Sequence, residues 1–213
     1  MQATQTHLIP IQELTPGMIA SIRNSVITQV VALTSKELNM PESALVVRDI
    51  RPYGDLGIYS MIGTAASSAG TEDWYTTASV ATVTAGYSSM TGAATMGDQR
   101  YVALFGVRDK RGTIGQVTLL ATATGLPGPQ YGARMVSLIK INVGGADKVI
   151  WDTDNIEAYP EQLAGFAPAA VIIPQNASYN ISYYIVKTTT GDSPIHLQLI
   201  GVVVEPRGKV ISP

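Results

Sequence analysis

The chain has 213 residues, a net charge of −2 and no cysteine, which excludes disulfides, thiolate catalysis and cysteine-ligated zinc. Asp, Glu, Lys and Arg make up only 14% of the residues, whereas they make up about a quarter of an ordinary soluble domain. A surface with so few charges resists aggregation poorly. We therefore expect copies of the chain to cover one another, the alternative being a monomer with an uncharged Ser/Thr surface.

Residues 1–12 are predicted to form an extended N-terminal arm. The arm is apolar around Leu8, Ile9 and Ile11, and Pro10 keeps it out of a central strand because proline has no amide hydrogen to donate. It lacks the basic start and the apolar core of a secretory signal. The arm either lies along its own domain or reaches a neighbouring subunit, and Leu8, Ile9 and Ile11 are candidate assembly contacts.

An amphipathic helix is predicted within residues 13–40, packed on the β-rich body. Thr15 is suited to the N-cap and Pro16 to the first helical position, where its missing N–H costs nothing. One apolar stripe has helical spacing: Met18, Ile19, Ile22, Val26, Val30 and Leu33. Ile27 and Val31 widen it and are further candidate assembly contacts. We expect the helix to plug one end of its own sandwich, the alternative being a contact between subunits.

Residues 41–213 are predicted to form the β-body. Short segments of alternating apolar and polar residues indicate strands over 44–50, 56–62, 74–86, 100–108, 113–121, 134–142, 148–152, 169–173, 179–187 and 195–204. Hairpin turns are expected at 109–112 and 144–147, and small-residue loops at 63–70 and 90–97. The predicted fold is all-β: an antiparallel β-sandwich of jelly-roll type, preceded by the arm and the helix.

Residue types that carry catalysis are scarce. The two histidines, His7 and His196, have no second histidine or carboxylate at metal-ligand spacing, so the metal site of an enzymatic jelly roll is disfavoured. We predict no catalytic residues, no enzyme activity and no cofactor. A Ser–His–Asp triad assembled across space is the alternative.

One cluster of oxygen ligands is a weak calcium candidate. Asp152, Asp154, Asn155 and Glu157 bring carboxylate and amide oxygens together, as Ca²⁺ prefers. The run lacks the glycine turn and full spacing of an EF-hand loop, and Asp and Asn are also ordinary turn residues. A plain polar turn is the favoured interpretation.

The charge pattern gives little sign of nucleic-acid or membrane partners. The 14 basic residues are scattered, whereas a nucleic-acid face requires a concentrated basic stripe. The longest helix candidate contains Arg23, Asn24 and Gln29, so no membrane span is predicted.

The C-terminal third, through residues 171–174, 180–184 and 197–206, resembles the last strands of viral single jelly-roll capsid or capsid-decorating proteins. The order of arm, helix and β-body is similar as well. The resemblance implies a role in forming a viral shell or the proteins that decorate its surface. The implied location is the virion, after synthesis in the host cytoplasm. The implied partners are copies of the chain and other virion proteins. The arm is not basic, which departs from an inner-shell protein that contacts a genome.

These observations predict a structural, self-assembling virion protein. A first alternative is an extracellular filament or surface-layer subunit in which residues 5–12 complete a neighbour's sheet by strand addition. A second is a carbohydrate-binding or hydrolytic β-sandwich in which Trp74, Trp151 and neighbouring tyrosines stack against sugars.

Overall fold

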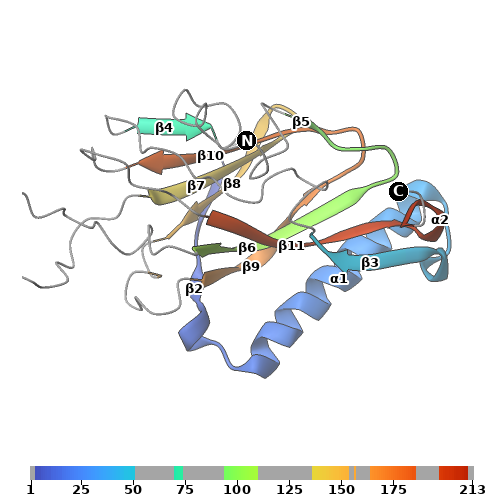
Figure 1. The fold of residues 1–213 in the computed structure, drawn as a ribbon, viewed down its shortest axis with the longest axis horizontal. Helices are drawn as coiled ribbons and strands as arrows, with labels where there is room; N and C mark the ends of the chain where they lie inside the picture. The colour runs from blue at the N-terminus through green and yellow to red at the C-terminus, as the bar shows by residue number, and fades with distance from the viewer. Residues whose placement is uncertain are drawn as a thin grey trace, which may run out of the picture.

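The computed structural model describes residues 3–50, 70–73, 94–109, 136–153, 156, 164–185 and 197–210. They form two β-sheets packed face to face, with one long helix on the outer face of one sheet (Figure 1). The strands predicted over 56–62, 74–86 and 113–121 lie outside the described residues, as does most of the turn predicted at 109–112.

Sheet A has the strand order β1-β8-β7-β10-β4, with the short β5 also beside β10. Its strands are β1 Thr4–His7, β4 Gly70–Asp73, β5 Ala94–Thr95, β7 Val136–Val143, β8 Ala146–Asp152 and β10 Ser178–Ile185. Sheet B has the order β2-β9-β6-β11-β3. Its strands are β2 Ile9–Pro10, β3 Leu45–Asp49, β6 Tyr101–Asp109, β9 Ala164–Ile173 and β11 Leu197–Pro206.

The sandwich is mostly antiparallel, as predicted, but the arm strand β1 runs parallel to β8, so sheet A is mixed. No hairpin joins β1 to β8, and therefore no turn sets the direction of their pairing. The turn between β7 and β8 is confirmed, since Gly144 and Gly145 have φ of 64° and 78°. Glycine adopts these positive values without steric cost.

One strand prediction and one loop prediction need correction. Strand β9 begins at Ala164 rather than at residue 169. Phe166 pairs with Gly106 and Val171 with Leu104, and the register shifts between these two pairs. Pro168 lies at this shift, so it interrupts the pairing with β6 without ending the strand. Such irregularities are where a sheet tolerates proline. The loop predicted at 90–97 contains the two-residue strand β5.

The core between the sheets contains the inward side chains of both. They include Val102, Leu104, Ile139, Ile141, Trp151, Ile173, Tyr179, Ile181 and Val203. A second apolar cluster covers the outer face of sheet B, where Tyr101, Ala103, Phe105, Val202 and Val204 pack with the helix. Strands β6 and β11 are thus buried on both faces, which explains the uninterrupted apolar run of Val202 to Val204.

The helix α1 spans Pro16–Leu38. As predicted, Thr15 is its N-cap, and its hydroxyl accepts a hydrogen bond from the amide of Met18 at 3.2 Å. Asn39, with φ of 51°, ends it in the left-handed conformation. The helix lies across the outer face of sheet B (Figure 1) rather than plugging an end of the sandwich, because that face is apolar and needs a cover.

Short helical segments complete the described chain: the 3-10 helices η1 Ile11–Glu13 and η2 Glu42–Ala44, and the C-terminal α2 Arg207–Val210. None of the described helices combines the length and the apolar character needed to cross a bilayer.

Candidate assembly surface

The N-terminal arm joins the edges of both sheets. Strand β1 extends sheet A beside β8, and β2 extends sheet B beside β9. Between them Leu8 turns into the core and is fully buried, and its amide donates to the carbonyl of Asp152 at 3.0 Å. Leu8 was expected to contact a neighbour, but it packs inside its own subunit and has no surface to offer in this conformation.

A glycine makes room for Leu8. A Cβ built on Gly165 would lie 2.8 Å from the Cβ of Leu8 and 2.5 Å from the Cδ1 of Ile156. Real Cβ atoms do not approach other carbons so closely, so the arm and β9 meet at this distance only because residue 165 has no side chain.

The other four candidate contacts are half-buried around the helix. Ile9 and Ile11 in the arm, and Ile27 and Val31 on α1, all pack against the cluster on the outer face of sheet B. Each keeps part of its surface exposed, and its contact with another subunit remains a prediction.

The exposed face of α1 was not among the predicted contact surfaces. It carries Ser21, Ser25, Thr28 and Ala32 at helical spacing, all exposed. No charged residue occurs between Arg23 and Lys36. The sequence does contain a signal for this surface. The helix face opposite the apolar stripe has no charged residues, whereas an ordinary surface helix has charged side chains there.

Glu205 forms a buried ion cluster near the C-terminal end of β11. Its side chain is 2% exposed and receives Arg48 Nη2 at 2.8 Å and Arg100 Nε at 3.0 Å. The side chains of the two arginines are 15% and 29% exposed. This cluster joins β3 and the start of β6 to the strand between them, so it has a structural role.

We expect Glu205→Gln to lower the free energy of unfolding by about 2–3 kcal/mol, because two guanidiniums then lie together without their carboxylate. Because both arginine side chains are partly exposed, the loss of unfolding free energy should be smaller than for a fully buried unpaired charge. Urea unfolding followed by circular dichroism measures it. Glu42→Gln, at an exposed position, is the control, and equal stability of the two variants would contradict a structural role for the cluster.

A second polar contact fixes the helix to sheet B. The Tyr101 hydroxyl donates to Glu37 Oε2 at 2.7 Å. Burial raises the pKa of Tyr101, and the neighbouring Glu37 carboxylate raises it further. The phenol therefore stays protonated at neutral pH, where it is the hydrogen-bond donor that ties the C-terminal half of α1 to β6.

Asp152 holds the arm through its side chain. Its Oδ2 accepts from Gln5 Nε2 at 3.0 Å and lies 3.3 Å from His7 Nδ1. This resembles the His–Asp half of a triad, but among the described residues no serine or threonine hydroxyl bonds to His7, whose side chain is 60% exposed. His196 lies outside the described residues. The contact fastens β1 to β8.

Only one of the four residues of the calcium candidate lies among the residues that the structure describes. Asp152 is buried and directed toward the arm, while Asp154, Asn155 and Glu157 lie outside the described residues. Within the described ranges, no three His, Cys, Asp or Glu side chains converge as a metal site would require. Calcium binding by these residues remains a prediction.

The tryptophan pair expected to stack sugars is not assembled at a surface. Trp151 is fully buried in the core between the sheets, so its ring cannot meet a sugar. Trp74 lies outside the described residues. The carbohydrate-binding alternative thus loses one of its two tryptophans.

Comparison with protein-family models and with curated proteins gives no match to this chain.

Proposed function

We propose that the sandwich is a jelly roll. The support is the pairing order of its strands once the arm strands β1 and β2 and the short β5 are set aside. Of the eight described strands that remain, the first in the chain pairs with the last (β3 with β11) and the second with the seventh (β4 with β10). The third pairs with the sixth (β6 with β9), and the fourth with the fifth (β7 with β8).

All four of these pairs are antiparallel. The order corresponds to one long hairpin, with its tip at Gly144 and Gly145, wound over itself into two facing sheets. Jelly rolls are eight-stranded double sheets of this kind, and viral capsid proteins, lectins and cupins use them.

We further propose that the chain is a structural subunit that assembles with copies of itself, as a coat or coat-decorating protein does. The observation that carries this proposal is the uncharged exposed face of α1, from Asn24 to Ser35. Burying such a face against another subunit costs little free energy, because no charged side chain has to be desolvated. The low charge of the whole chain favours the same role.

The test is the mass of the purified full-length chain across a concentration series, measured by sedimentation equilibrium. We expect species larger than one chain, in proportions that rise with concentration. A single-chain mass at every concentration would contradict the proposal, since the uncharged face would then be an ordinary hydrated surface.

Strand addition is the second candidate, because the arm pairs with an edge of each sheet. In a filament the same strands would complete the sheets of a neighbour. In this structure the arm completes the sheets of its own subunit. Assembly by strand addition therefore requires the arm to be released from those sheets first.

A further inference from the structure

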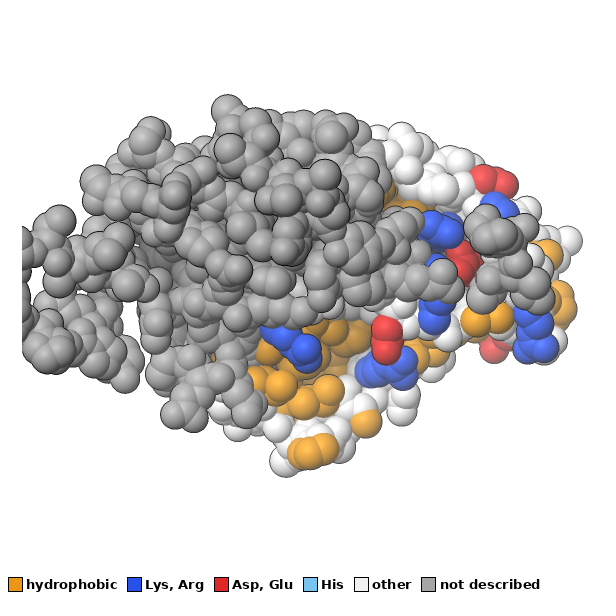
Figure 2. Space-filling view, in the orientation of Figure 1, with side chains coloured by type: hydrophobic (Ala, Val, Ile, Leu, Met, Phe, Trp, Pro, Cys, Tyr) orange, Lys and Arg blue, Asp and Glu red, His pale blue; other side chains and the backbone are white. Residues whose placement is uncertain are grey.

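An apolar groove lies between the first turns of α1 and the outer face of sheet B. It has a volume of about 280 Å³, close to the lower limit of about 300 Å³ for the sites of drug-sized ligands. Ile19 of α1 contributes to one wall, and Phe105, Phe166 and Ile200 of sheet B contribute to the other. Figure 2 shows hydrophobic side chains gathered on this face, with basic side chains beside them. The groove therefore has the size and the walls for a small apolar molecule.

A glycine separates two of the apolar side chains that line the groove. Gly106 of β6 pairs with Ile200 of β11 on one side and with Phe166 of β9 on the other. A Cβ on Gly106 would lie 3.5 Å from the Cβ of Ile200 and 3.4 Å from the ring of Phe166. Because residue 106 has no such atom, no side chain of the middle strand fills the space between these two.

A cation and an amide lie side by side on the lining of the groove. Arg108 of β6 and Gln198 of β11 are paired residues, and both line the groove. Their neighbours Val107 and Leu199 point into the core between the sheets, so Arg108 and Gln198 share the outer face of sheet B. Opposed residues of an antiparallel pair have Cβ atoms about 5 Å apart. The guanidinium and the amide can therefore donate hydrogen bonds to the same small group.

Arg108 leaves the groove with one unbalanced positive charge. The other charged lining residues, Arg23 and Asp49, form an ion pair at 2.9 Å. Arg108 is exposed, and within the described part of the chain neither Arg108 nor Gln198 has a hydrogen-bond or ion-pair partner. Arginine donates two parallel hydrogen bonds to a carboxylate. Apolar walls with one unpaired guanidinium are thus complementary to an apolar molecule that carries a carboxylate.

We propose that the groove binds a small organic carboxylate with an apolar tail. The tail lies between α1 and sheet B, against Phe105 and Phe166, and the carboxylate accepts hydrogen bonds from Arg108 and Gln198. This binding site is separate from the surface proposed for self-assembly, because no residue of the uncharged stretch from 24 to 35 lines the groove. The inference therefore adds a ligand to the structural role and does not depend on assembly.

The first test is calorimetric titration of the full-length chain with octanoate, kept below its micellar concentration. We expect saturable binding of one octanoate per chain. Octanamide has a tail of the same length and no charge, so it should bind about threefold to tenfold more weakly, as for the loss of one partly exposed ion pair with its hydrogen bonds. Octylammonium should bind more weakly still, because its charge is repelled by Arg108. Equal binding of the three probes would contradict the inference, since the tail alone would then be recognised.

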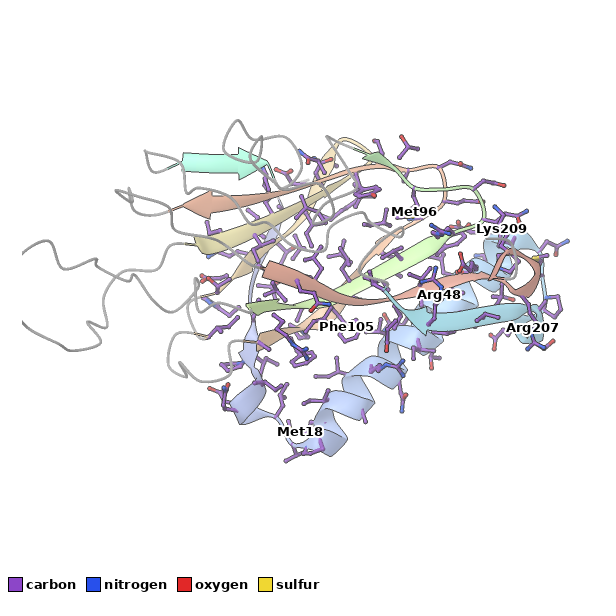
Figure 3. All side chains as sticks on the ribbon, in the orientation of Figure 1. Met18, Arg48, Met96, Phe105, Arg207 and Lys209 are labelled. Carbon is purple, nitrogen blue, oxygen red and sulfur yellow. The ribbon has the colours of Figure 1, made fainter. Side chains whose placement is uncertain are left out.

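The second test removes the cation. Arg108→Met keeps an apolar stem, so it should weaken octanoate by the same factor of about three to ten and leave octanamide unchanged. Arg207→Met is the matched control, because Arg207 is exposed on α2 and lies far from Phe105 (Figure 3). It should leave both dissociation constants unchanged. Circular dichroism verifies that both variants are folded. A preference for octanoate that persists in Arg108→Met would place the carboxylate elsewhere and overturn the inference.

The third test asks whether the carboxylate belongs to a free molecule or to another protein. The competitor is a short peptide with a C-terminal phenylalanine, which carries the same two groups at the end of a chain. If the peptide binds more tightly than octanoate, the groove is a docking site for a protein terminus and the small-ligand inference fails. It fails also if octanoate does not bind up to its micellar concentration. Neither result affects self-assembly, which is judged by the mass of the chain alone.

Discussion

Gly201→Ala should destabilise the protein by about 3 kcal/mol or more, as expected for overpacking against backbone that cannot move aside. A Cβ at this position would lie 2.4 Å from the carbonyl oxygen of Ala103 and 2.6 Å from the Cδ1 of Ile50. Gly201 stands at the register shift between β11 and β6, in the middle of sheet B. Relief of the clash requires the two strands to separate, which breaks ladder hydrogen bonds with no water to replace them.

Urea unfolding of the purified variant measures the loss as a lower midpoint at an unchanged slope. The control is Gly97→Ala, because a Cβ there meets no atom within 4 Å and should change stability by less than about 0.5 kcal/mol. Gly106→Ala is a second test, since its Cβ would lie 2.6 Å from the carbonyl oxygen of Gly165. Wild-type stability of Gly201→Ala would show that the pairing of β6 and β11 is looser than this structure has it.

The cost is high because sheet B is buried on both sides. Its inner face meets sheet A and its outer face meets α1. A strand at the edge of a sheet can shift toward solvent to accommodate a methyl group. Strands β6 and β11 have a paired neighbour on each side as well, so they have no direction in which to move.

Leu8→Asp should release the N-terminal arm from the sandwich. A carboxylate cannot remain in the apolar gap that Leu8 fills, so β1 and β2 leave the sheet edges instead. We expect loss of the leucine contacts to cost about 3 kcal/mol or more. The amides of β1 should exchange with deuterium at least about tenfold faster, as for a segment that opens locally.

Thr4→Asp is the matched control, since it adds the same charge to the same arm at an exposed position. Its arm should stay protected. Slow exchange in Leu8→Asp, equal to that of the wild type, would mean that the contacts of Gln5 and His7 with Asp152 hold the arm without Leu8.

The Leu8 variant also separates the two kinds of assembly. Filaments made by strand addition require the arm to be inserted in a sheet, so they should disappear entirely when Leu8 cannot enter a core. Subunits that meet through α1 should still form small assemblies, because that surface does not involve the arm. Electron microscopy and sedimentation of the same sample distinguish the two results.

Local sequence patterns predicted a large part of this fold. The caps at Thr15 and Pro16 place the start of α1, since capping depends on hydrogen bonds within one turn. The glycines at 144 and 145 place the β7–β8 hairpin for a similar reason. Period-two alternation located most of the described strands, because in a sandwich each strand turns one face to the core.

The candidate site was predicted less well. The sequence identified Leu8, Ile9, Ile11, Ile27 and Val31 as apolar positions in the arm and helix, but apolar character alone does not distinguish a core from an interface. Leu8 turned out to be core because the chain passes from sheet A to sheet B at that residue, opposite Gly165. That crossing joins segments more than 150 residues apart.

Composition and spacing in the chain were enough to specify a helix followed by a β-rich body with few charges, because those properties depend on neighbouring residues. Contacts between distant segments specified the rest: that α1 covers sheet B and that β1 pairs in parallel with β8. The position of α1 follows from the apolar outer face of β6 and β11. That face exists only when two strands whose paired residues are 88 to 103 positions apart lie side by side, and no local pattern records such a pairing.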